Sequence, residues 1–258
     1  MARWLIATAV VASLVSCSSS VRVSGPQPTP FGAPRVDLEA VAQHAAQFKD
    51  AKNSRPAGSQ EEFAAASYIT AHLQKAGYFV QLDPVPVTDT VRSTNVIALP
   101  PSGGDPKVIV VCAYTRGTAV WLGDGGSIGL FLELARALRV AAPDHAVEFV
   151  GLGGEGAPVP GTYLGSRRLV QTLVDADEHP TVIELWDVDP EPSSVSWFAK
   201  GPDAHRLVGL APGGRVSSIG GREPSDPFDE AGLGHDLVSG SARGAAAALL
   251  DLLTRAAG

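Results

Sequence analysis

The segment from Val108 to Leu138 constrains the fold more than any other part of the chain. It opens with an unbroken apolar run from Val108 to Ala113, which is typical of a strand buried on both faces in a parallel sheet. The three- and four-residue spacing of a helix that packs one face on that sheet follows at Ile128, Leu130, Phe131, Leu134, Ala135 and Leu138. A loop containing Asp124 joins the two elements, and open α/β sheets bind ligands beyond the carboxyl ends of their strands. We therefore expect Asp124 to lie near any site that the protein has.

Strand-like and helix-like patterns alternate along most of the chain. Short apolar or alternating runs predict strands at residues 79–82, 95–99, 147–152, 181–185 and 194–198. Helical spacing predicts helices at residues 36–48, 163–173 and 243–255. A capping box of Ser59 and Glu62 starts a further helix that Gly77 ends, and residues 202–224 are ambiguous. This alternation predicts an α/β fold with a central mixed, mostly parallel sheet and helices on both faces.

The amino-terminal residues resemble a bacterial lipoprotein signal. Arg3 precedes an apolar run too short to cross a bilayer comfortably, and Leu14-Val15-Ser16-Cys17 resembles the lipobox, whose Cys becomes the acylated first residue of the mature protein. An ordinary signal peptide that happens to contain a Cys is the alternative. The resemblance implies a signal peptide at residues 1–16, an acylated Cys17 with a flexible tether at 17–35, and a folded domain at 36–258. We expect the protein to be exported and anchored by lipid on Cys17 to the outer face of a bacterial membrane.

Composition and charge narrow the classes of partner. The chain has 258 residues, 45% of them hydrophobic, which is enough for one sizeable core. Its formal net charge is −7, and no cluster of Lys or Arg offers the footprint that a nucleic-acid backbone requires. With Cys17 acylated, Cys112 has no disulfide partner and is expected to be a small buried hydrophobic residue. We therefore expect no nucleic-acid partner.

Several motifs after Asn53 resemble, in the right order, the secreted zinc aminopeptidases with two co-catalytic metal ions, whose superfamily includes the glutaminyl cyclases. These motifs are the Arg-x-x-Gly-Ser start at residues 55–59, Asn-Val-Ile-Ala at 95–98, Phe-Leu-Glu-Leu-Ala-Arg at 131–136, Gly-Ser at 165–166, and Ser-Asp-Pro-Phe-Asp-Glu-Ala-Gly at 225–232. The resemblance implies a zinc-aminopeptidase-like fold over most of the chain. It also implies a catalytic site in which a bridging carboxylate, His residues and further carboxylates hold two zinc ions, and a Glu accepts a proton from water.

The first half of that metal site is only partly present. The family's His-x-Asp at the end of the central strand corresponds to Ala113-Tyr114-Thr115. The bridging carboxylate corresponds to Asp124, whose neighbours both differ from the family's Asp-Asp-Asn loop. The family's Glu-Glu pair corresponds to Glu155-Gly156, so the general-base position is kept and the ligand beside it is missing.

The second half departs further from the family pattern. The family's next carboxylate ligand corresponds to Trp186 or Asp187. The family's last His ligand directly follows a Ser-Asp pair, but in this chain Pro227 directly follows Asp226, so that His is absent. His235 lies several residues further on and is a poor substitute. Asp124 and Asp187 are therefore the metal-ligand candidates, and we expect no cofactor, or zinc if any metal binds.

These departures lead to one main hypothesis and to alternatives from other classes. We expect a pseudoenzyme with a peptide- or protein-binding cleft, because Glu155 has little to deprotonate without a metal-bound water. An active metallo-exopeptidase could instead use Asp124, Asp187 and His235, with Glu155 as base. The pattern Gly-x-Ser-x-Gly around Ser127 raises a serine-hydrolase alternative, with Asp187 or Asp226 and then His235. Asp124 equally suits a helix cap, and a purely structural role with a filled cleft stays open.

Overall fold

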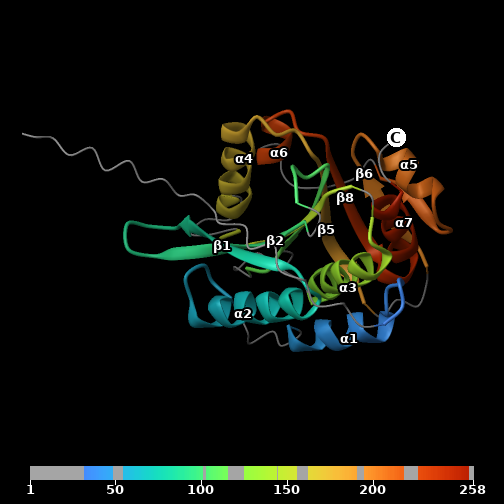
Figure 1. Cartoon of the computed structure of the whole chain (residues 1–258), viewed down its shortest axis with the longest axis horizontal. Coiled ribbons are helices and arrows are strands. Elements are labelled where there is room, and N and C mark those ends of the chain that lie inside the picture. The colour runs from blue at the N-terminus through green and yellow to red at the C-terminus, as the bar shows by residue number, and fades with distance from the viewer. Residues whose placement is uncertain are drawn as a thin grey trace, which may run out of the picture.

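A single mixed β-sheet forms the centre of the part of the chain that the structure describes (Figure 1). The structure is a computed structural model, and it describes residues 32–48, 55–100, 103–115, 125–143, 145–155, 162–190, 195–217 and 226–255. Cys17 and Asp124 lie outside the described residues, and so do the predicted signal peptide and nearly all of the tether. Among the described residues, no helix is long and apolar enough to cross a membrane.

The sheet has eight described strands in the order β1-β2-β4-β3-β5-β8-β6-β7. Their bounds are β1 Phe79–Pro86, β2 Arg92–Leu99, β3 Val108–Ala113, β4 Val147–Leu152, β5 Thr181–Asp189, β6 Trp197–Lys200, β7 Gly214–Val216 and β8 His235–Ser241. The strands β4, β3, β5 and β8 run parallel to one another, whereas β1 pairs antiparallel with β2, β2 with β4, and β6 with β8; β7 runs parallel to β6. Both faces of β3 are buried, as its apolar run predicts.

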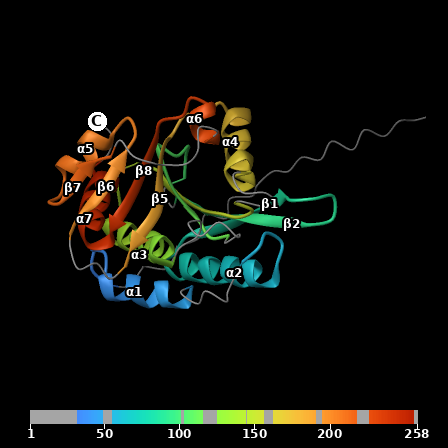
Figure 2. The ribbon, with the colours of Figure 1, turned by 180° about the vertical axis from the view of Figure 1, so that it is seen from behind.

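Helices cover both faces of the sheet (Figures 1 and 2). Their bounds are α1 Leu38–Gln47, α2 Gln60–Lys75, α3 Gly125–Ala141, α4 Leu164–Ala176, α5 Ala204–Gly209, α6 Pro227–Glu230 and α7 Ala242–Thr254. The larger hydrophobic cluster joins one sheet face to α1, α2, α3, α5 and α7. The smaller cluster joins the other face to α4 and α6 through Leu169, Leu173, Phe228 and Leu233. The expected α/β fold with a mixed sheet and helices on both faces is confirmed.

Local signals in the sequence place most helix ends. In α2, the Ser59 hydroxyl accepts a hydrogen bond from the Glu62 backbone N–H at 3.0 Å, which caps the first turn. Gly77 follows the last turn with φ of 91°, a left-handed conformation that suits Gly. The Glu62 carboxylate does not close the expected capping box, because it accepts from the Gly58 backbone N–H instead.

Two elements near the carboxyl terminus were not expected from the sequence. Strand β8 lies between β5 and β6 inside the sheet, and the short helix α6 precedes it. Strand β5 continues past the predicted residue 185 to Asp189 through an irregularity between Leu185 and Val188. The ambiguous stretch at residues 202–224 contains α5 and β7.

Candidate functional site

The two residues that follow the carboxyl end of β3 are buried and hydrogen-bonded within the protein. Tyr114 is fully buried, and its hydroxyl donates to the Thr94 carbonyl oxygen. Burial raises the pKa of Tyr114, with a smaller contribution from the negative charge of Glu62. Thr115 is also buried, and its hydroxyl donates to Oε1 of Glu62 at 2.8 Å. The two residues after β3 therefore face the interior.

The Glu62 carboxylate links this strand end to its neighbours. Besides Thr115, its Oε1 accepts hydrogen bonds from the Ser93 hydroxyl at 2.6 Å and from the Gly154 backbone N–H at 3.0 Å. Its Oε2 accepts from the Gly58 backbone N–H. Because Ser93, Thr115 and Gly154 belong to or adjoin three different strands, one side chain of α2 joins the ends of β2, β3 and β4. The network is fully internal, as Glu62 is only 3% exposed.

Glu155, the predicted general base, follows β4 and is fully buried. Its Oε1 accepts hydrogen bonds from the backbone N–H of Ser166 at 2.7 Å and from the Ser166 hydroxyl at 3.1 Å. Ser166 is itself buried near the start of α4. The carboxylate thus connects the end of β4 to α4.

Asp187, the predicted ligand on β5, is exposed and lies in the irregular part of the strand. Its φ of 49° is a left-handed conformation that is uncommon outside Gly, Asn and Asp. The other predicted ligand, Asp124, lies outside the described residues. Of the residues predicted for the strand-end site of the main hypothesis, the structure therefore places Asp187 and the buried Glu155.

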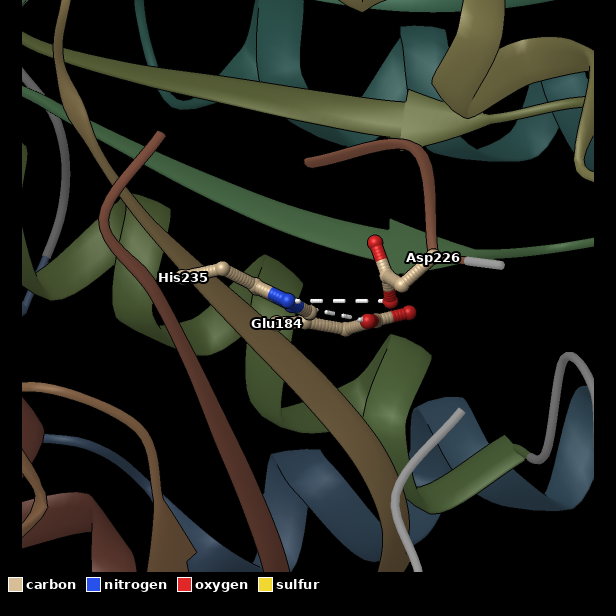
Figure 3. A group of neighbouring side chains, drawn as sticks. All are labelled: Glu184, Asp226 and His235. Carbon is tan, nitrogen blue, oxygen red and sulfur yellow. Dashed lines mark hydrogen bonds and ion pairs between the residues drawn. The ribbon is translucent and has the colours of Figure 1, made fainter. Parts of the chain in front are cut away.

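A second group of ionisable side chains lies on the sheet face covered by α4 and α6. Glu184 of β5, Asp226 before α6 and His235 at the start of β8 point toward one another (Figure 3). Each offers one ligand atom, and these atoms all lie within 4.8 Å of one another. Nε2 of His235 lies 3.2 Å from Oε2 of Glu184, and Nδ1 lies 3.6 Å from Oδ2 of Asp226.

The three side chains of this group are buried, and a backbone hydrogen bond and an aromatic ring hold two of them in place. Glu184 is fully buried, Asp226 is 2% exposed and His235 is 7% exposed. Asp226 is the N-cap of α6, and its Oδ1 accepts from the Phe228 backbone N–H at 2.9 Å. The Phe228 ring packs against the His235 ring with centroids 5.2 Å apart. Asp229 is exposed and places Oδ1 3.8 Å from Nδ1 of His235.

Comparison with known proteins identifies the fold. No protein-family model matches the chain, and no curated protein matches it by sequence. Among solved structures, a Bacteroides vulgatus protein described as a Zn-dependent exopeptidase shares 15% identity over 88% of this chain and 99% of its own, with a TM-score of 0.68. A Bacteroides thetaiotaomicron leucine aminopeptidase precursor shares 14% identity over 80% of this chain and 86% of its own, with a TM-score of 0.63. This chain has the zinc-aminopeptidase-like fold.

A glutaminyl cyclase of Bacteroides thetaiotaomicron, solved with N-acetylhistamine, has the same fold. It shares 15% identity over 80% of this chain and 85% of its own chain, with a TM-score of 0.62. The zinc-aminopeptidase-like fold expected from the order of motifs is confirmed, and at these identities the likeness concerns the fold alone.

The two groups of residues differ in how well they suit a metal ion. At the strand ends, Tyr114 and Thr115 supply a phenol and a hydroxyl that are hydrogen-bonded internally, and neither is a common zinc ligand. An imidazole and two carboxylates, by contrast, are ordinary zinc ligands, and Glu184, Asp226 and His235 bring them together. The described residues that fit zinc therefore lie in the second group.

Sequence reasoning named His235 as a displaced metal ligand and as the His of a serine-hydrolase alternative, and did not name Glu184 as a site residue. One signal was available. Glu184 lies inside an apolar run that predicts a buried strand, and a Glu is almost never fully buried without a partner. The partner could not be read from the sequence, because His235 lies 51 residues further along the chain.

Proposed function

We propose that this protein is a lipid-anchored, extracytoplasmic protein with a zinc-aminopeptidase-like fold that has lost aminopeptidase catalysis and binds a peptide or protein. The protein would thus be a pseudoenzyme. The binding cleft would lie at the strand ends, where the family resemblance places the catalytic residues.

The environment of Glu155 is the observation that carries the proposal. A general base has to reach a water or a substrate, within a hydrogen bond or through one intervening water. Glu155 is fully buried, and its Oε1 is held by both the backbone and the hydroxyl of Ser166. A carboxylate held in this way stabilises the packing of β4 against α4 rather than activating water.

The residues around Glu155 support the same conclusion. The position of the family's first His is taken by Ala113, which has no ligand atom, and Tyr114 beside it is buried and hydrogen-bonded to Thr94. Thr115, at the position of the family's supporting Asp, donates its hydroxyl to Glu62. Zinc at the strand ends would therefore lack ligands that the family uses, and we derive no catalytic step through it.

The alternatives are less well supported. Ser127 is buried within α3, and its Oγ accepts from the Val188 backbone N–H at 3.2 Å, whereas a serine nucleophile has to be exposed to substrate. An atypical metallo-exopeptidase would need Asp187 and His235 in one site. Asp187 is exposed at the strand irregularity, whereas His235 is buried beside Glu184.

Membrane anchoring is proposed from the lipobox-like residues ending in Cys17. Two acyl chains or more on one Cys give stable attachment, because a single chain binds membranes only reversibly. The anchored domain would face the outside of the membrane and present its cleft there to peptides or proteins.

Aminopeptidase assays on the full chain in detergent test the loss of catalysis. We expect no hydrolysis of aminoacyl amides above buffer with added zinc, and no difference between wild type and Glu155→Gln. A bona fide zinc aminopeptidase in the same detergent serves as the positive control. Zinc-dependent hydrolysis that disappears in Glu155→Gln would refute the pseudoenzyme proposal.

A further inference from the structure

We propose that Glu184, Asp226 and His235 form a metal site that binds one divalent ion of the zinc class. Glu184 and Asp226 are not among the residues that the family resemblance assigns to the catalytic centre, and His235 entered there only as a displaced ligand. The role of the metal site would be structural, joining β5, α6 and β8, and it does not depend on the proposed loss of catalysis.

The backbone presents the three side chains from fixed positions. Glu184 alternates along β5 with Ile183 and Leu185, which belong to the larger hydrophobic cluster, so Glu184 faces the side of α4 and α6. His235 pairs with Val182 in the adjacent parallel strand β8, and Val182 faces the same side. Side chains on neighbouring strands and at a helix cap are held more precisely than side chains on loops, which favours a defined metal geometry.

The surroundings of the two imidazole nitrogens of His235 match a common arrangement of metal-bound His. Metal ligation uses one ring nitrogen, and the other nitrogen usually donates to a carboxylate that orients the ring. His235 has a carboxylate beside each nitrogen, Glu184 at 3.2 Å and Asp226 at 3.6 Å. An ion at Nδ1 would take Asp226 as a second ligand and leave Glu184 to orient the ring through Nε2, and an ion at Nε2 would exchange these two roles.

Asp226 is itself held in position for ligation. Its Oδ1 accepts the backbone N–H of Phe228 at 2.9 Å, which directs Oδ2 toward His235. The separation of 3.6 Å between Oδ2 and Nδ1 is too long for a hydrogen bond. It is close to the roughly 3.4 Å that separates two ligands bound to one tetrahedral zinc at usual bond lengths.

Charge and access also suit a divalent ion. Two carboxylates and one imidazole, all buried, carry a net negative charge even when His235 is protonated, and a divalent cation balances it. The imidazole favours zinc over calcium or magnesium, which prefer oxygen ligands. Asp229, 69% exposed and with Oδ1 3.8 Å from Nδ1, offers a further, solvent-exposed donor to an ion at Nδ1.

Metal content and stability of the full chain in detergent test this site. We expect about one zinc per chain after removal of weakly bound metal, and a Tm that is roughly 5 °C higher with zinc than with EDTA. Asp226→Asn and His235→Gln should lose the zinc and the Tm difference. His179→Gln is the matched control, because His179 is exposed and its Nε2 lies 3.5 Å from Oδ1 of Asp177, elsewhere on the chain.

X-ray absorption at the zinc edge of the wild-type protein tests the ligand set without any variant that could fail to fold. We expect one imidazole together with oxygen donors. Two imidazoles would place the ion at the His44 and His72 pair, whose ring centroids lie 4.6 Å apart, and would overturn the proposal.

Other outcomes also decide the question. A folded wild-type protein that binds no zinc would overturn the proposal, and so would zinc retained in both Asp226→Asn and His235→Gln. Zinc lost in Asp187→Asn but retained in His235→Gln would place the ion at the strand ends. Bound zinc without aminoacyl-amide hydrolysis agrees with both proposals, whereas hydrolysis that His235→Gln abolishes refutes the pseudoenzyme and leaves the metal site standing.

Discussion

Buried carboxylates take different roles at the scale of single residues. Glu62 accepts hydrogen bonds that join three strand ends, Glu155 accepts from Ser166, and Glu184 lies beside His235. Burying a carboxylate is unfavourable unless it gains such partners. The partners therefore indicate which role each carboxylate has: the first two stabilise the strand-end region, and the third belongs to the candidate metal site.

Glu148 on β4 should make the stability of the protein depend on pH. Burial, and secondarily the charge of Glu178, raise the pKa of Glu148 from 4.5 to about 7. A raised pKa means that the folded state holds the proton more tightly than the unfolded state. The contribution of Glu148 to stability is therefore complete below pH 4.5 and is lost as the pH rises through 7.

Urea unfolding of Glu148→Gln at two pH values measures this effect. We expect the variant to be more stable than the wild type by about 2 kcal/mol at pH 8, and nearly equal to it at pH 4. Glu61→Gln, an exposed residue of the first turn of α2, is the control. Equal pH dependence in the wild type and Glu148→Gln would contradict the assignment.

At the scale of elements, α3 is the helix on which the larger hydrophobic cluster is built. Most of its residues are buried, and both α1 and α7 pack against it, with α7 also contacting β6 and β8 of the sheet. The approach of α1 depends on Gly residues. A Cβ at Gly129 would overlap the Val41 carbonyl oxygen, and a Cβ at Gly125 would overlap that of Ala45. The two helices can therefore pack this closely only because α3 lacks side chains at these points.

Gly129→Ala should weaken the packing of α1 on α3. Because backbone atoms of Val41 block the added methyl group, the helices have to separate, and we expect a loss of about 3 kcal/mol in the free energy of unfolding. Gly209→Ala, at the end of α5, is the control because no atom lies within 4 Å of its added Cβ. Urea denaturation that gave the two variants the same midpoint would refute the packing argument.

At the scale of the whole molecule, one mixed sheet with a helical layer on each face supports both regions of interest. Glu155 and Asp187 adjoin the carboxyl ends of β4 and β5, whereas Glu184 and His235 lie within the sheet under α4 and α6. The folded domain follows an amino-terminal segment with a lipobox-like sequence. A domain arranged in this way could bind a partner at its strand ends while its amino-terminal end is attached to a membrane.

Cys17→Ala tests the proposed attachment in a bacterium that acylates lipoproteins. We expect the wild type to incorporate labelled palmitate and Cys17→Ala to incorporate none, because Cys17 is the proposed acylated residue. Cys112→Ala is the matched control, since Cys112 is a buried residue of β3. Labelling that persists in Cys17→Ala, measured on the purified protein, would rule out anchoring through this residue.

The sequence alone determined the elements whose patterns are local. Strand β3 and helix α3 follow from apolar periodicity, and the start and end of α2 follow from Ser59 and Gly77. The order of such elements was enough for the fold class, because strand and helix segments that alternate along a chain have few ways to pack. The predicted site residues Glu155 and Asp187 were located by sequence order, but their environments were not.

Only the tertiary structure decided which polar residues meet. Strand β8 contains His, Asp, Ser and Gly and has no strong apolar pattern, and it becomes a central strand only by pairing with β5 and β6. That pairing brings His235 to Glu184, and α6 brings Asp226 to both. Contacts between residues so far apart in sequence depend on strand order and register, which residue spacing along the chain does not encode.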